Sequence, residues 1–127
     1  YGWLEESPED PHPDGTEAPI ATWTPHTSVN GMTMRPANLP GDDHTVYATV
    51  FGSWATILPK GHQILKIDFT QTDDGWAGEV EVFASDVGTP LPITGGPDGN
   101  LYYATFDHGG AVHVISPQTF DGSFDWS

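Results

Sequence analysis

Short apolar runs separated by clusters of turn-forming residues dominate the hydrophobic pattern of this chain. Residues 45–51 are mostly β-branched or aromatic and predict a strand. Residues 64–69 predict a second strand, in which apolar and polar positions alternate. One face of that strand carries Leu65, Ile67 and Phe69, and the other carries Ile64, Lys66 and Asp68. Since only the first face is purely apolar, we expect this strand to be buried on one side.

Weaker versions of the same pattern predict further short strands along the chain. Gly, Pro, Asn and Asp separate these strands, as expected of turns. Gly and Pro together number 27 (15 Gly and 12 Pro), which leaves little room for helices. The additional strands are expected at residues 20–23, 31–35, 78–84, around 93, 101–106 and 111–116, with a tight turn at 107–110. The strand at 78–84 is expected to be an outer strand with one face exposed to solvent.

An internal repeat organises these strands into two units. Residues 41–49 and 97–105 share a layout, a turn followed by an apolar strand that ends in Ala-Thr. A short strand precedes each copy and an aliphatic strand follows it. Four-stranded antiparallel units in series are typical of β-propeller blades. The pattern therefore predicts an all-β fold, a β-propeller fragment of about two four-stranded antiparallel blades, with a β-sandwich of seven or eight strands as the alternative.

This pattern divides the chain into two regions. Residues 1–19 are acidic, rich in proline and without periodicity, so we expect an acidic loop or blade connection. Residues 20–127 are expected to form the two blades, as part of one larger propeller domain. A closed propeller needs about four or more blades. The remaining blades are expected from the same parent polypeptide, from another chain, or from symmetry-related copies. The start at Tyr1, without an initiator Met, also suggests a processed product or part of a longer polypeptide.

The charge balance excludes several classes of partner. The chain has 18 Asp and Glu against 3 Lys and Arg, a formal net charge of −15. Such a charge repels nucleic acid and anionic membrane surfaces, and no apolar run is long enough to insert into a membrane. The absence of Cys excludes disulfides and thiolate chemistry. The composition is typical of a halophilic or an acidic secreted protein, and we expect an extracellular, periplasmic or cell-surface location.

Four motifs, in order along the chain, point to a known family. They are Tyr1-Gly2-Trp3, Pro25-His26-Thr27-Ser28, Gly52-Ser53-Trp54, and the run Gly-Pro-Asp-Gly-Asn-Leu-Tyr at residues 96–102. With these motifs the chain resembles the C-terminal part of the glucose/sorbosone dehydrogenase family. The resemblance implies a six-bladed propeller that uses pyrroloquinoline quinone (PQQ) and oxidises an aldose or sorbosone by hydride transfer to the quinone.

The chain departs from this family at two basic positions. Where the family has Asn-Arg after Gly-Ser-Trp, this chain has Ala55-Thr56, and its Gly-Arg near the last strand is Gly110-Ala111. PQQ carries three carboxylates, and Arg is the residue best suited to bind carboxylates in a bidentate manner. A non-catalytic propeller relative that binds carbohydrate or protein is therefore the alternative, as is a propeller assembled from several copies.

Candidate site residues fall in the loops after the predicted strands. His26 could act as a general base on a sugar hydroxyl, and the pair Asp107 and His108 could act as acid and base or bind a metal. For each of them a purely structural role in a turn is the alternative. The residues that could contact the cofactor lie in the long loop between the strands predicted at 45–51 and 64–69. They are Trp54, which could stack on a ring, Lys60 and His62.

Acidic turns supply the candidates for a cation site. Ca²⁺ takes oxygen ligands from carboxylates in turns. Asp42, Asp43 and Asp98 are the candidates, although none has the spacing of a calcium-binding loop. The alternative is that each carboxylate is solvated or bonds to its own turn. The six His residues show no paired spacing of the kind that zinc sites have.

Overall fold

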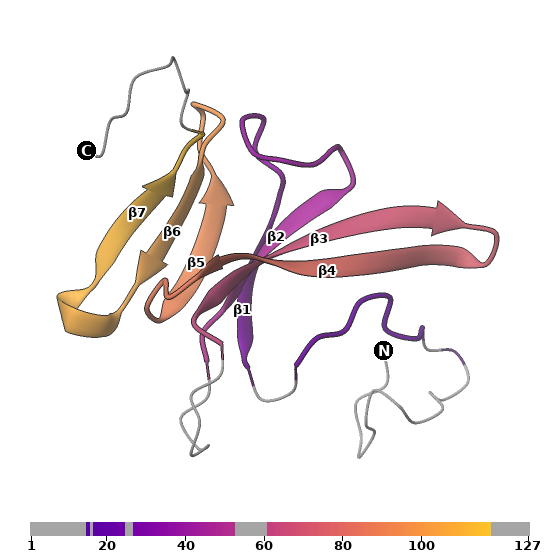
Figure 1. Ribbon diagram of the computed structural model, residues 1–127, viewed down its shortest axis with the longest axis horizontal. Helices are drawn as coiled ribbons and strands as arrows, with labels where there is room; N and C mark the ends of the chain where they lie inside the picture. Colours follow the sequence, from indigo (N-terminus) through magenta and orange to yellow (C-terminus); the bar gives the residue numbers. More distant parts are fainter. Residues whose placement is uncertain (1–14, 16, 25–26, 53–60, 118–127) are drawn as a thin grey trace.

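Two antiparallel β-sheets, packed against each other, make up the protein (Figure 1). The computed structural model describes residues 15, 17–24, 27–52 and 61–117. The first sheet has the strand order β1 (Val29–Met34), β2 (Thr45–Val50), β3 (Gln63–Thr72) and β4 (Gly75–Ser85). The second sheet has the order β5 (Pro90–Gly95), β6 (Leu101–Thr105) and β7 (Ala111–Ile115). Each strand therefore pairs with its neighbour in sequence, as in a propeller blade.

The predicted strands and the internal repeat are largely confirmed. All seven strands fall on or beside predicted ones, and the predicted turn at 107–110 is a short 3-10 helix, η1 (Asp107–Gly109). The prediction of a strand at 20–23 is wrong. This segment is extended but has no strand pairing, although the Ile20 carbonyl accepts a hydrogen bond from the Gly78 amide of β4 at 2.7 Å. Among the described residues, no helix is long and apolar enough to cross a membrane.

The core between the two sheets forms where β1 and β2 pack against β5. Gly31 in β1 allows this close approach, because a Cβ there would lie 2.8 Å from the Leu91 carbonyl oxygen. Side chains from both sheets fill the space beyond this contact. They are Leu39, Tyr47, Ile64, Ile93, Leu101 and Tyr103, each at most 9% exposed. This shared core is what makes the two sheets one packed unit.

The central strand β3 is buried on both of its faces. On the face away from the second sheet, Leu65 and Ile67 pack with Ala48 and Val50, partly covered by Trp23. The prediction that only this face would be buried is wrong. On the opposite face, Ile64 is fully buried and Lys66 is only 9% exposed. The second sheet and the polar partners of Lys66 cover that face, and the sequence of β3 alone does not show either of them.

Both outer faces of the sheet pair expose large apolar side chains. On the first sheet, Met32 lies opposite Ala48 and Val82 lies opposite Leu65, so both share the outer face with those residues. Met32 is 56% exposed and Val82 is 51% exposed. On the second sheet, Val112 is exposed to 76% and Val114 to 53%. The arrangement is that of two consecutive β-propeller blades, with an apolar face at each end of the pair.

Candidate functional site

The loops gather at two ends of the blades. At one end, which we call the loop end, lie the connections β2–β3, β4–β5 and β6–β7 (Figure 1). These are residues 51–62, 86–89 and 106–110, together with the entry into β1. The connections β1–β2 and β5–β6 lie at the opposite end. Three of the predicted site residues, His26, Trp54 and Lys60, fall outside the described residues.

His62 lies at the loop end, directly before the first residue of β3. Its ring Nδ1 is 2.8 Å from the carbonyl oxygen of Gly88, in the β4–β5 connection. The His62 carbonyl in turn accepts a hydrogen bond from the Val87 amide at 3.2 Å. The backbone of His62 has a φ of 57°, in the left-handed region that non-glycine residues rarely adopt. His62 is thus fixed at two points against the connection that joins the two sheets.

Asp107, which follows β6 in the second sheet, forms hydrogen bonds with the same β4–β5 connection. Its Oδ1 accepts hydrogen bonds from the hydroxyl of Thr89 at 2.8 Å and from the Thr89 amide at 3.4 Å. The Asp107 amide donates to the Thr89 hydroxyl at 3.2 Å. A Cβ on Gly88 would lie 3.1 Å from the Asp107 carboxylate. These contacts give Asp107 a structural role in anchoring the loop; His108 lies beside it in η1.

The residues predicted to bind Ca²⁺ lie at the opposite end, where the carboxylates of Asp42 and Asp98 bond within turns. The Asp42 carboxylate accepts a hydrogen bond from the His44 amide at 2.7 Å. Asp98 accepts hydrogen bonds from the Tyr102 hydroxyl at 2.6 Å and the Asn100 amide at 3.1 Å, which lower its pKa. Asp43 is exposed. Within the described ranges, no group of three or more His, Asp or Glu side chains is placed to hold a metal ion.

A charged network on β3 was not predicted from the sequence. The Lys66 ammonium bonds to the Asp68 carboxylate, and its second partner, Glu81 of β4, is at 3.2 Å. Asp68 also accepts a hydrogen bond from the Thr45 hydroxyl at 2.6 Å. Hydrogen bonds from Lys66 and then Thr45 lower the pKa of Asp68, while the bond to Asp68 raises the pKa of Lys66. The sequence does contain a signal for this pair: a Lys and an Asp two residues apart on one strand have their side chains on the same face.

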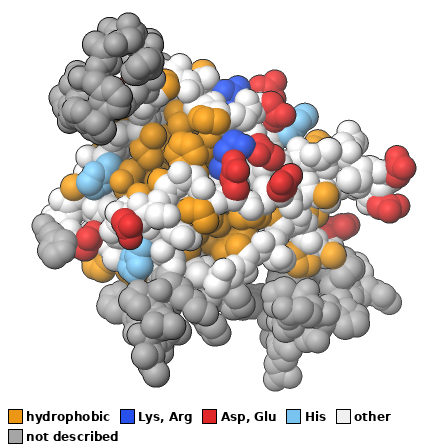
Figure 2. Space-filling model, viewed as in Figure 1, with side chains coloured by type: hydrophobic (Ala, Val, Ile, Leu, Met, Phe, Trp, Pro, Cys, Tyr) orange, Lys and Arg blue, Asp and Glu red, His pale blue; other side chains and the backbone are white. Residues whose placement is uncertain are grey.

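The described residues do not fit an anionic cofactor with three carboxylates. Two of the three basic side chains are described. Arg35 donates to the backbone carbonyls of Ala37 and Leu39, both at 3.0 Å, at the end opposite the loop end. Lys66 is engaged by its two carboxylate partners. Figure 2 also shows many more acidic than basic side chains on the face it presents. Any cation that holds PQQ must therefore lie outside the described residues.

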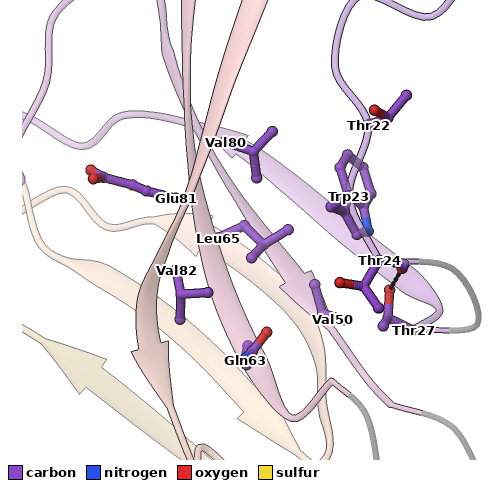
Figure 3. A pocket seen from close by; sticks show the side chains of 10 residues that line it. All are labelled: Thr22, Trp23, Thr24, Thr27, Val50, Gln63, Leu65, Val80, Glu81 and Val82. Carbon is purple, nitrogen blue, oxygen red and sulfur yellow. Dashed lines mark hydrogen bonds between the residues drawn. The ribbon is translucent and has the colours of Figure 1, made fainter.

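A cavity of about 230 Å³ lies on the outer face of the first sheet (Figure 3). The segment around Trp23 forms one wall, and apolar side chains of the sheet, including Leu65 and Val80, form the other. The Thr27 hydroxyl donates to the Thr24 carbonyl at 2.9 Å. The Glu81 side chain points away from the cavity (Figure 3). The cavity is smaller than most ligand sites, which span roughly 300–1,000 Å³, and it contains none of the predicted site residues.

No protein-family model matches the chain, and no curated protein matches it. Among solved structures, the chain is similar to the holo form of the pyranose dehydrogenase PQQ domain from Coprinopsis cinerea. The match is 20% identical, has a TM-score of 0.42, and covers 61% of this chain and 25% of that chain. A similarity at this level carries no argument about the present chain, so the fold assignment rests on its own sheet topology.

Proposed function

We propose that the chain supplies two blades of a larger β-propeller of the quinoprotein sugar dehydrogenase type. The observation that carries the proposal is the exposure of apolar side chains on both outer faces of the sheet pair, Met32 and Val82 on one and Val112 and Val114 on the other. Monomeric proteins rarely leave such faces open. Further blades, from the same parent polypeptide or another chain, would cover both faces.

The dehydrogenase part of the proposal is supported by the sequence motifs. Gly52-Ser53-Trp54 follows β2 in the sequence, and the motif at 96–102 covers the β5–β6 turn and the first two residues of β6. The loop end, with His62 and Asp107, would then face the sugar substrate. We place the cations that hold PQQ outside the described residues, because Arg35 and Lys66 are already bonded.

The test is reconstitution of the complete parent polypeptide. PQQ and Ca²⁺ are added, and the reduction of a dye is followed with aldoses and sorbosone as substrates. We expect reduction that depends on both sugar and PQQ, with protein lacking PQQ as the control. If the fully folded propeller reduces no dye with any of these sugars, the proposed dehydrogenase activity is ruled out.

A non-catalytic propeller that binds carbohydrate or protein is the second candidate. Ala111, at a position where the family has Arg, starts β7 at the loop end and offers no charge to a carboxylate. This candidate predicts carbohydrate binding without dye reduction. A third arrangement, a ring closed by three copies of two blades each, predicts a native mass three times that of one chain. A monomeric mass would rule out the ring.

A further inference from the structure

We propose that the outer edge of β4 binds an extended peptide segment by strand addition. The segment carries apolar side chains on one face and Lys or Arg on the other. This surface lies outside the proposed function, because the edge of a blade stays open when further blades cover its two faces. The unpaired backbone of β4, the cavity beside it and the charge of the strand define the partner.

The backbone of β4 has hydrogen-bonding groups that no strand pairs with. β4 is an edge strand, since it pairs with β3 on one side only. The Gly78 amide points away from β3, because it donates to the Ile20 carbonyl at 2.7 Å. Backbone direction alternates along an antiparallel strand, so the amides and carbonyls of Val80 and Val82 also point outward. Among the described residues, no group bonds to them, and such a row is a template for another strand.

The cavity on the outer face of the first sheet lies beside these groups (Figure 3). Val80 and Val82 belong to one of its walls, together with Leu65, and Trp23 belongs to the other. Paired strands lie about 4.8 Å apart, and residues directly opposite each other share a face. A strand added to β4 would therefore place apolar side chains next to the cavity. Its volume of about 230 Å³ accommodates one large apolar side chain, since about 150 Å³ holds a benzene ring.

The opposite face of β4 determines the charge of the segment. Glu79 and Glu81 alternate with the two valines and are exposed. The Glu81 side chain is 61% exposed although it lies 3.2 Å from Lys66. Opposite charges on facing residues stabilise a strand pair, and the net charge of −15 attracts a basic segment from a distance. Pairing of β4 with β4 of a second copy is disfavoured, because it would bring glutamates of both copies onto one face.

Binding of a designed peptide to the parent polypeptide tests the inference. The probe is acetyl-Lys-Leu-Lys-Leu-Lys-amide, whose Leu residues would lie opposite Val80 and Val82, and calorimetry measures its affinity. We expect the affinity to fall about tenfold or more when both Leu amides carry N-methyl groups, because these amides would bond to β4. It should also fall when Glu replaces each Lys. Absence of binding, or equal affinity for the three peptides, would overturn the inference.

Two substitutions at one position separate the main chain of β4 from its side chain. Val82→Pro removes the outward N–H, and Pro is tolerated on an edge strand where that N–H faces solvent. Val82→Thr is the matched control, since Thr has nearly the same shape and keeps the N–H. We expect Val82→Pro to weaken peptide binding about tenfold and Val82→Thr less than about threefold. Equal affinity of the two variants would contradict strand addition.

Hydrogen exchange of the natural protein gives a readout that needs no variant. Bound peptide should slow exchange in fragments that cover residues 80–82 and leave those from β7 unchanged. Unchanged exchange at 80–82 in the peptide-saturated protein would overturn the inference. Slow exchange there before any peptide is added would overturn it as well. A doubled native mass would then assign the edge to a second copy, and an unchanged mass would assign it to another part of the parent polypeptide.

Discussion

The Thr49 hydroxyl in β2 donates a hydrogen bond of 2.6 Å to the Leu91 carbonyl in β5 and so joins the two sheets. Thr49 is fully buried. A neighbouring blade thus contributes a polar contact within an otherwise apolar core, and the contact fixes the relative position of the two sheets. Because a buried hydrogen bond of this kind depends on exact placement, it tests the packing of the blades more sharply than apolar contacts do.

Thr49→Val should therefore destabilise the protein. Valine has nearly the same shape but leaves the Leu91 carbonyl without this donor, at a cost of about 1–3 kcal/mol in the free energy of unfolding. Urea unfolding measures the change. Thr94→Val is the control, because Thr94 is exposed and its hydroxyl bonds to the adjacent Gly95 carbonyl. Equal midpoints for the two variants would show that the sheets do not meet at Thr49 and Leu91.

Gly31→Ala should push the two blades apart. The added methyl group would lie 2.8 Å from the Leu91 carbonyl oxygen and 3.1 Å from the Thr49 hydroxyl, and the backbone atom cannot rotate away. We expect a loss of about 1–3 kcal/mol in unfolding free energy, as for other overpacked cores. At Gly95 the nearest atom is a side-chain carbon of Pro36 at 3.3 Å. Gly95→Ala should cost less, and a reversed order would contradict the close contact of β1 with β5.

The Lys66–Asp68 ion pair makes stability depend on pH in a defined direction. The folded pKa of Asp68 is lowered from 3.8, so its contribution is present above that value and is lost as the pH falls through the lowered pKa. The folded pKa of Lys66 is raised from 10.5, so its contribution is lost as the pH rises through the raised value.

Asp68→Asn tests the acid side of this dependence. The difference in urea midpoint between the natural protein and the variant should be largest near about pH 7 and shrink toward about pH 2.5. Asp73→Asn, in the exposed β3–β4 turn, is the control and should show a small difference at every pH. A difference for Asp68→Asn that stays constant with pH would show that the ion pair does not contribute.

The sequence predicted the fold better than it predicted the site. The β-branched run of β2 and the alternation of β3 defined two strands, and the repeat placed two sheets in series. Residues 20–23 have a similar local pattern but form no strand pairing with the sheet, so local propensity misassigned them. The burial of Ile64 escaped prediction because side chains of the second sheet, distant in sequence, pack against it.

The candidate site depended even more on contacts between distant segments. His62 was predicted as a cofactor contact, and its ring Nδ1 lies 2.8 Å from the carbonyl oxygen of Gly88, 26 residues away. For Asp107 the sequence left a catalytic and a structural role open. The bonds to Thr89, 18 residues away, support the structural one. Loop composition indicates which residues are candidates, and only the packing of the connections shows which partners distant in sequence they contact.

The most direct measurement for the central claim is the accessibility of the outer face of the second sheet. The chain has no Cys, so Val112→Cys introduces a thiol whose reaction with a maleimide can be timed in the parent polypeptide. Asp73→Cys, in the exposed turn, gives the rate of an open site. If another blade covers Val112, its thiol should react at least about tenfold more slowly than the thiol at position 73. Equal rates in the folded protein would show that the face is open and that the two blades do not belong to a larger propeller.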